Sequence, residues 1–499
     1  MLNLLKPLRL LCNGQIGLMF CCLPLAVIGG NQGCAQTPAQ FRGSWAGTVN
    51  LFGTPANVLF DFRPLHRPGT AGMATVSLPS IGLHSVQVDR FVPYGDSLKL
   101  LMSGLPGAYV ARPMADTLGL TGYLLVAGQR LPLRVRPVSP AGLAQLLPAR
   151  SQTPRWPRPY RELATTFTGG APGVALAGTI TAPPSLSGPG IVFISGSGPH
   201  NRDGEEFGHK SFLVPADELT RRGFVVLRYD ERGVGASTGH FAAAGTADFA
   251  RDAAAAVRAL RNDRRLHVGK VFLIGHSQGT LEVAMVAAQD PALAGVVLLG
   301  AIGQPVAALY QERLRAQFHD RLAAASAADK PSVERYVTMY NRLIAIAATV
   351  SDSATALAHM RRELPTAGVS EQEVLSYAPS YLEHTVHDIL AQDPTPYLQK
   401  MKMPVLALTG ELDTETPASN QFPALQTQLQ RAGNKHVTLT LVPRVNHFFQ
   451  TNAPGHEMPI FDNPETFSPV ELQLLSEWLT RQAKSGNIDG KAKNSKAGH

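Results

Sequence analysis

Cysteine is almost absent from this 499-residue sequence: its four cysteines all lie within the first 34 residues. If the chain is cleaved after Ala35, the mature protein has none, which excludes disulfides, thiolate metal sites and a catalytic cysteine. No later segment offers the roughly 18 apolar residues of a membrane span, so we expect no stable span in the mature form. Charged residues amount to only 16%, hydrophobic residues to 44%, and the net charge is +8. Most of the chain can therefore bury a core, and we find no nucleic-acid-binding motif.

The first 35 residues have the pattern of a secretory signal peptide. Lys6 and Arg9 supply positive charge without an acid, residues 16–28 are mostly apolar, and small residues precede a cleavage site after Ala35. We therefore expect the protein to be exported, to the periplasm or out of the cell. A lipid anchor on Cys34 and an uncleaved membrane anchor are the two alternatives.

Residues 36–150 predict an all-β domain. Glycine and proline interrupt this region often, and apolar residues alternate with other residues in the short runs between them. Alternation with a period of two indicates strands that bury one face. No catalytic group of residues stands out, so the domain could bind carbohydrate, bind a partner or only cover the rest of the protein. The two clearest runs are Val58, Phe60 and Phe62, and Leu131, Leu133 and Val135.

The rest of the chain has a different pattern. Residues 151–168 predict a linker, because three prolines fall within the first ten of them. In residues 169–483, short apolar runs alternate with helical stretches, which indicates a mostly parallel sheet with helices on both faces. Residues 303–396 interrupt this order without a clear strand, and we expect them to form a helical cap beside the ligand site. Residues 484–499, with four lysines and one aspartate, predict a disordered basic tail. The expected strands span 191–194, 224–229, 271–274, 295–299, 404–408 and 437–442.

The pattern G-x-S-x-G occurs twice, around Ser237 and around Ser277. Ser277 follows the apolar run 271–274 with only two residues between, and small, helix-compatible residues follow it. This strand–turn–helix context is that of a nucleophile elbow, which lifts the serine hydroxyl out of the sheet edge. Ser237 follows a longer loop and precedes no helix, so we expect it to form hydrogen bonds within its own turn. Ser277 is the candidate nucleophile.

A serine nucleophile needs a base, and the base needs an acid that orients it. The acid is expected just past the strand at 404–408, where the loop offers Glu411, Asp413 and Glu415. We choose Asp413, because a turn at Gly410 can direct it back to the sheet edge. The two glutamates are expected to face water or to cap the next helix.

The base is expected on the loop after the strand at 437–442, where His447 lies. His436 precedes that strand, at its wrong end, and His456 lies in a loop rich in proline and glycine. His276 precedes the serine, and we expect it to point into the surroundings of the sheet. The order Ser277, Asp413, His447 is the chain order of α/β-hydrolase triads.

The oxyanion that forms during acyl transfer needs backbone N–H donors. Gln278, the residue after the nucleophile, is expected to supply one, and the glycine-rich loop after the strand at 191–194 the other. Ser197 is our choice in that loop, and Gly196 is the alternative. We expect no metal site and no cofactor, since His200, Asp203 and His209 have no metal-binding spacing.

These motifs, in this order, resemble those of secreted bacterial α/β-hydrolases of the esterase and serine aminopeptidase-like group. The resemblance covers roughly residues 170 to 483 and implies an α/β-hydrolase fold, preceded here by the all-β domain. Phe41 to Gly47 also resembles the β-rich leader of some of these proteins. The resemblance implies that the loop around Ser237 is structural. The motifs that carry the resemblance are Ser195-Gly-Ser-Gly-Pro199, Asp230-Glu-Arg-Gly-Val-Gly-Ala-Ser237, Gly275-His-Ser-Gln-Gly279, Gly410-Glu-Leu-Asp413 and Asn446-His447.

The expected function is hydrolysis of a small-molecule carboxylic ester through an acyl-enzyme. The first alternative is an aminopeptidase, which needs an acid in the cap to bind a free substrate amine. The second is a binding protein on an inactive hydrolase scaffold, against which the complete set of triad residues argues. The sequence leaves the oligomeric state open. The cap acids available to an aminopeptidase are Glu312, Glu363, Glu371, Glu373 and Glu383.

Overall fold

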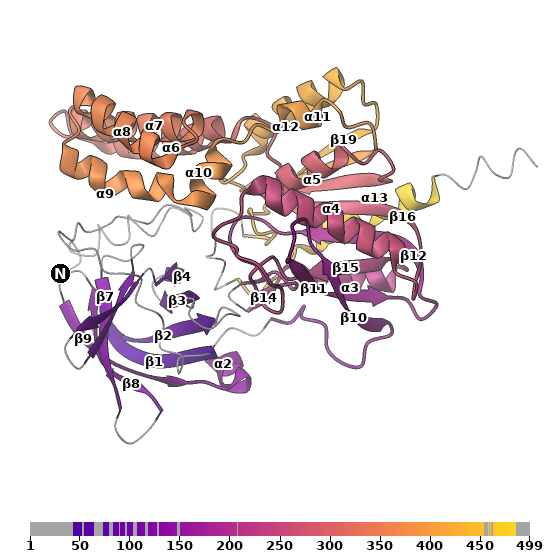
Figure 1. The fold of residues 1–499 in the computed structure, drawn as a ribbon, viewed down its shortest axis with the longest axis horizontal. Helices are drawn as coiled ribbons and strands as arrows, with labels where there is room; N and C mark the ends of the chain where they lie inside the picture. The colour runs from indigo at the N-terminus through magenta and orange to yellow at the C-terminus, as the bar shows by residue number, and fades with distance from the viewer. Residues whose placement is uncertain are drawn as a thin grey trace, which may run out of the picture.

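The structure is a computed structural model, and its two main bodies are an N-terminal sheet and a larger α/β domain that carries a layer of helices (Figure 1). The expected signal peptide, Cys34 and the expected tail from residue 486 onward lie outside the described residues. The structure describes residues 43–485, apart from 52–53, 64–72, 79–82, 89, 95–96, 103–106, 115–117, 127–128, 147–149, 207, 454–457, 459 and 461–462.

The N-terminal body is a nine-stranded antiparallel sheet in the order β4-β3-β2-β1-β9-β8-β7-β6-β5. In β9, Leu133 and Val135 are buried while Arg134 and Arg136 are exposed, so the alternation in the sequence becomes one apolar and one polar face. This confirms the expected all-β fold. The strands are β1 (Gly43–Leu51), β2 (Thr54–Arg63), β3 (Met73–Leu78), β4 (Leu83–Gln87), β5 (Arg90–Tyr94), β6 (Ser97–Met102), β7 (Gly107–Pro113), β8 (Leu120–Val126) and β9 (Gln129–Pro137), and a short helix α2 (Pro140–Leu146) follows them.

The larger domain contains an eight-stranded sheet in the order β10-β11-β15-β12-β16-β17-β18-β19. Only β10 and β11 run antiparallel to their neighbours, and the other pairs are parallel. This topology confirms the expected α/β-hydrolase fold. The strands are β10 (Arg161–Thr168), β11 (Ala175–Ala182), β12 (Ser187–Ile194), β15 (Val225–Tyr229), β16 (His267–His276), β17 (Gly295–Leu299), β18 (Val405–Gly410) and β19 (Val437–Val442), with a small hairpin of β13 (Glu205–Glu206) and β14 (His209–Lys210) beside them.

The predicted linker is too long. Residues 161–168 are not a connection but strand β10, which pairs along its full length with β11. The prolines that suggest a linker all precede this strand. Exposed and half-buried side chains follow one another along the strand, because it lies at the edge of the sheet.

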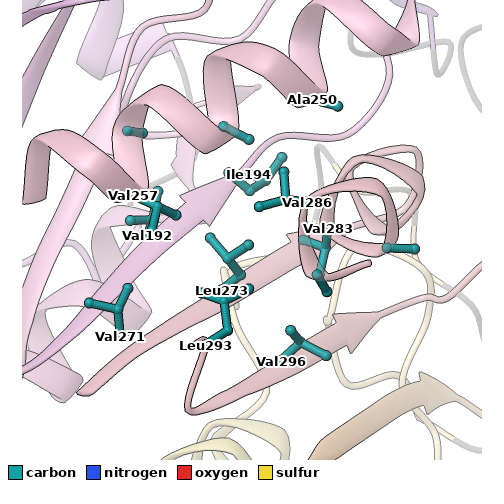
Figure 2. Packing of buried hydrophobic residues seen from close by; sticks show 14 of the residues in the cluster. Val192, Ile194, Ala250, Val257, Val271, Leu273, Val283, Val286, Leu293 and Val296 are labelled. Atoms are coloured by element: carbon teal, nitrogen blue, oxygen red, sulfur yellow. The ribbon is translucent and has the colours of Figure 1, made fainter. Parts of the chain in front are cut away.

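Helices cover both faces of this sheet, as the alternating strand and helix pattern predicts. Val192 and Ile194 point to one face, where they pack with apolar side chains of α4, α5 and α12, including Val257 and Val286 (Figure 2). Phe193, between them, points to the other face, which α3 and α13 cover. The helices are α3 (Leu213–Arg221), α4 (Thr246–Asn262), α5 (Gly279–Ala287), α12 (Ala418–Arg431) and α13 (Pro469–Lys484).

The segment between β17 and β18 forms the expected helical cap. Its helices bury a core of their own, in which Met339, Leu343 and Met360 are fully enclosed, and Leu281 of α5 and Ile302 connect this core to the domain below. No helix within the described residues is both long and apolar enough to cross a bilayer. The cap elements are α6 (Val306–Ala324), α7 (Lys330–Thr349), α8 (Ser353–Glu363), η2 (Leu364–Ala367), α9 (Glu371–Leu382), α10 (His384–Leu390) and α11 (Thr395–Leu398).

Candidate active site

Ser277 lies on a tight turn between the end of β16 and the start of α5. Its φ angle is +53°, in a region that costs a non-glycine residue conformational energy. The turn is held because the Ser277 N–H donates to the carbonyl of Leu299 at 2.9 Å. A side chain at Gly279 would bring its Cβ within 2.2 Å of the Ser195 carbonyl oxygen. The glycine therefore permits the helix to start directly against the neighbouring loop.

Asp413 and His447 are joined by a hydrogen bond of 2.9 Å between Oδ2 of the aspartate and Nδ1 of the histidine. The other Asp413 oxygen accepts from the N–H groups of Glu415 and Thr416, at 2.9 and 2.8 Å. The Thr416 hydroxyl donates to Oδ2 at 2.8 Å. Both residues are buried, at 5% and 8% exposure. The carboxylate is thus fixed on all sides and directed at the imidazole.

The loop that carries His447 is built around Asn446. The Asn446 side-chain oxygen accepts from the N–H groups of Phe448 and Gln450, at 3.1 and 2.9 Å, which closes a tight turn. A Cβ at Gly410 would lie 2.0 Å from the Val445 carbonyl oxygen, so the loops that follow β18 and β19 are packed directly together. The sequence motif Asn446-His447 thereby acts as a turn that presents the imidazole to Asp413.

His276 connects the loop of His447 to the elbow. Its Nε2 lies 3.1 Å from the His447 carbonyl oxygen, and the two imidazole rings are 4.8 Å apart between centroids. His276 therefore points toward the loop that follows β19. Within the described residues the Ser277 hydroxyl has no hydrogen-bond partner, so its bond to His447 is not formed in this conformation. Such bonds are often long in ligand-free hydrolases.

The buried pair shifts the pKa of both partners. Burial alone would lower the pKa of His447, but the Asp413 charge and hydrogen bond raise it above the ordinary value. Burial alone would raise the pKa of Asp413, but His447 and the bonds from Thr416 lower it below the ordinary value. The aspartate is thus held ionised, and the imidazole beside it becomes a stronger base.

The raised pKa of His447 predicts the acidic side of the pH–rate profile. Only neutral imidazole can accept the serine proton, so kcat/KM should fall as the pH drops through the His447 pKa. We expect the midpoint to lie above 6.5, the ordinary value for histidine. Initial rates on a neutral ester between pH 5 and 9 would measure it. A midpoint below 6.5 would mean that the Asp413 charge does not act on His447 as described.

The backbone N–H groups near the elbow that have no acceptor within the described residues include those of Gly196, Ser197 and Gln278. Gln278 follows Ser277 directly, as a residue of an oxyanion hole must. In the other loop, a Cβ at Gly196 would lie 3.3 Å from Cβ of Ser277, so this loop lies directly beside the proposed nucleophile. Ser197 and its alternative Gly196 both stay candidates for the second donor.

Gly300, at the end of β17, is a site residue that the sequence motifs do not reveal. A Cβ there would lie 3.1 Å from Cε1 of His447 and 3.1 Å from Oγ1 of Thr416, and its φ angle is +56°. We expect Gly300→Ala to displace the imidazole and to lower kcat about 100-fold. Gly173→Ala is the matched control, because its φ angle is +76° with open space around it. Equal losses of kcat in both variants would contradict the contact argument.

The remaining candidates of the sequence have other partners. The Ser237 hydroxyl donates to the Asp230 carbonyl at 2.6 Å and accepts from the N–H of Ala177 at 2.9 Å, which confirms its structural role. Glu411 is exposed and accepts from the N–H of Arg444 at 2.9 Å. Glu415, expected to face water or to cap a helix, instead forms an ion pair with Arg313 of α6.

The described residues contain no group of three His, Cys, Asp or Glu side chains that could hold a metal ion. The three residues weighed for such a site have separate partners. His200 Nδ1 lies 2.8 Å from the Gly198 carbonyl oxygen, Asp203 pairs with Arg228, and His209 lies 2.8 Å from the Thr466 hydroxyl.

Parts of the sequence are similar to known proteins. The family model described as serine aminopeptidase, S33, matches residues 209–368, which include Ser277 but end before Asp413. Esterase EstD of Thermotoga maritima is 24% identical over 307 residues, which cover 61% of this chain and 63% of the esterase. The matched parts of the chain are thus similar to the serine aminopeptidase, S33, family and to an esterase.

The chain matches less than two thirds of the length of that esterase. Among solved structures, the chain is similar to the Pyrococcus furiosus esterase Pf2001, with a TM-score of 0.40 and 15% identity, and the match covers 65% of the chain and 92% of the esterase. A thermophilic esterase of Thermogutta terrifontis gives a TM-score of 0.38 and 19% identity, and the match covers 64% of the chain and 100% of that esterase.

Proposed function

We propose that the protein hydrolyses carboxylic esters, with Ser277 as nucleophile, His447 as general base and Asp413 as the acid that orients it. One observation carries the proposal: the buried hydrogen bond of 2.9 Å between Asp413 and His447. This pair lies beside the strained turn of Ser277, to which His276 links it through the His447 carbonyl oxygen. A buried acid–imidazole pair next to a serine elbow is the arrangement that acyl transfer needs.

In the proposed reaction, Ser277 Oγ attacks the acyl carbon of the ester as its proton passes to Nε2 of His447. Asp413 holds Nδ1–H of His447 and stabilises the imidazolium that forms. The carbonyl oxygen becomes an oxyanion, which accepts from the N–H of Gln278 and from that of Ser197 or Gly196. The imidazolium then protonates the leaving alcohol, and the acyl group remains on Ser277. Water, deprotonated by His447, releases the carboxylic acid and restores the serine.

The aminopeptidase alternative is not favoured. The relative with the sequence match is an esterase by name, which supports ester cleavage here. The cap acids that could bind a substrate amine also have partners in the structure. They are Glu312 with Gln304 and Asn420, Glu363 with Arg362, Glu371 with Arg361, Glu373 with Arg335, and Glu383 with the N–H groups of Thr385 and Val386.

The test is turnover of p-nitrophenyl esters from acetate to palmitate, compared with aminoacyl p-nitroanilides. We expect ester hydrolysis with an optimum in acyl length, which measures the space beneath the cap, and at least about 100-fold slower anilide cleavage. Faster anilide cleavage would favour the aminopeptidase. Saturable binding of esters without any release of nitrophenol would instead indicate a binding protein on an inactive scaffold.

A further inference from the structure

We propose that Arg313 and Glu415 form a positioning pair that fixes the cap to the loop of Asp413 and thereby keeps the Asp413–His447 pair in its active geometry. This inference rests on the proposed function, because it assigns a role to residues next to the proposed triad. Neither residue is a candidate for contact with the reacting atoms. Both act through their neighbours.

A continuous chain of polar contacts runs from the cap to the imidazole. Arg313 on α6 forms an ion pair with Glu415, and both side chains are mostly buried, at 17% and 13% exposure. The N–H of Glu415 donates to Oδ1 of Asp413 at 2.9 Å, and Oδ2 of Asp413 binds His447. The Arg313 guanidinium also lies 5.2 Å from the centre of the Tyr310 ring. A shift of α6 would therefore pull on the loop that holds the proposed acid.

The next residue of the same helix makes a second, separate link. Glu312 accepts from Asn420 of α12 at 2.8 Å and from Gln304 at 2.6 Å. Two consecutive residues of α6 thus hold the segment that follows β18. Arg313 binds its loop, and Glu312 binds its helix α12. The two links differ in charge environment, because only the first lies next to the imidazole.

The charged groups around His447 make the proposed pair testable through the pKa of His447. Asp413 and Glu415 raise the pKa of His447, whereas Arg313 lowers it. His276 of β16 packs against the imidazole, with its own pKa held well below the ordinary value by burial and by His447. Burial, and to a lesser extent the Asp413 charge, raise the pKa of Glu471 of α13 well above its ordinary value. Removing Arg313 or Glu415 alone should therefore move the His447 pKa in opposite directions.

The test combines Arg313→Met, Glu415→Gln and the double variant. For ester hydrolysis, we expect the acidic midpoint of kcat/KM to move to higher pH in Arg313→Met and to lower pH in Glu415→Gln. The double variant should return close to the wild-type midpoint, because both charges are gone. All three should lose about 10- to 100-fold in kcat, since the acid loop is no longer held by the cap.

Two controls separate positioning from general stability. Arg335→Met breaks the ion pair with Glu373 inside the cap and should leave both the midpoint and kcat unchanged. Asn420→Ala breaks the second link and should leave the midpoint unchanged, whatever its effect on kcat. Midpoints that stay at the wild-type value in both single variants would overturn the proposal, as would shifts in the same direction.

A histidine NMR titration of the resting protein reads the His447 pKa without any substrate, with the signal assigned by its loss in His447→Gln. Opposite shifts in Arg313→Met and Glu415→Gln, in a protein that cleaves no ester, would keep the positioning pair and reject the proposed function. Ester turnover with no shift in the titration would reject the pair and keep the function.

Discussion

Replacing Ser277 with alanine is expected to lower kcat for ester hydrolysis about 10⁴- to 10⁶-fold, while the fold stays intact. The variant loses the atom that forms the acyl-enzyme, so only unassisted attack by water on the bound ester remains. Alanine is smaller than serine and keeps the positive φ angle of this turn, so we expect little change in the free energy of unfolding. Turnover of p-nitrophenyl acetate and thermal unfolding would measure the two quantities side by side.

Ser237→Ala is the matched control, because Ser237 lies in the other G-x-S-x-G sequence. It removes a buried hydroxyl that bonds to Asp230 and Ala177, and it leaves the N–H of Ala177 without that acceptor. We expect a loss of about 1–3 kcal/mol in the free energy of unfolding and nearly unchanged kcat. If Ser237→Ala abolished turnover and Ser277→Ala did not, the choice of nucleophile would be wrong.

Asp413→Asn is expected to lower kcat about 10⁴-fold, because the amide can donate to Nδ1 of His447 and so hold the wrong tautomer. The residual activity should also titrate at lower pH than in the wild type. The Asp413 charge raises the His447 pKa, and its removal lowers that pKa, so the neutral base persists in more acidic solution. A pH–rate profile of the purified variant gives both numbers.

Glu411→Gln is the control for this variant, because it removes a carboxylate from the same loop. Glu411 is exposed and accepts from the N–H of Arg444 at 2.9 Å, a bond that glutamine can also form. We expect kcat within twofold of wild type. A large loss in Glu411→Gln, or an unchanged midpoint in Asp413→Asn, would mean that the acid has been assigned wrongly.

The fold could be predicted from the sequence where a segment is buried on both faces. Strands β17 and β19 have the predicted bounds, and β18 differs only at its ends, because short apolar runs between turn residues identify central strands well. The edge strand and the exposed strand ends are harder to predict from the sequence. The predicted linker includes β10, and β16 begins at His267, four residues before its apolar run, because its first half pairs with β12 in a partly exposed region.

The residues of the candidate site also differ in how well the local sequence predicts them. Ser277, Asp413 and His447 could be chosen as candidates because each follows a recognisable strand, and the ends of parallel strands meet at one edge of the sheet. Gly300, Glu415 and Arg313 could not be assigned from local sequence. Gly300 has its role because His447 packs against it, and the Glu415 partner comes from the cap. Such contacts depend on how distant segments pack, which no local pattern records.

The most direct test of the proposed catalytic serine is to label the protein with a fluorophosphonate and to locate the adduct by peptide mass spectrometry. A serine activated by an imidazole attacks phosphorus and retains the label, whereas ordinary serines do not react. We expect one adduct per chain, on the peptide that contains Ser277, and its disappearance in Ser277→Ala and His447→Gln. An adduct on Ser237 or another residue, or no adduct in a folded and ester-cleaving protein, would contradict this expectation.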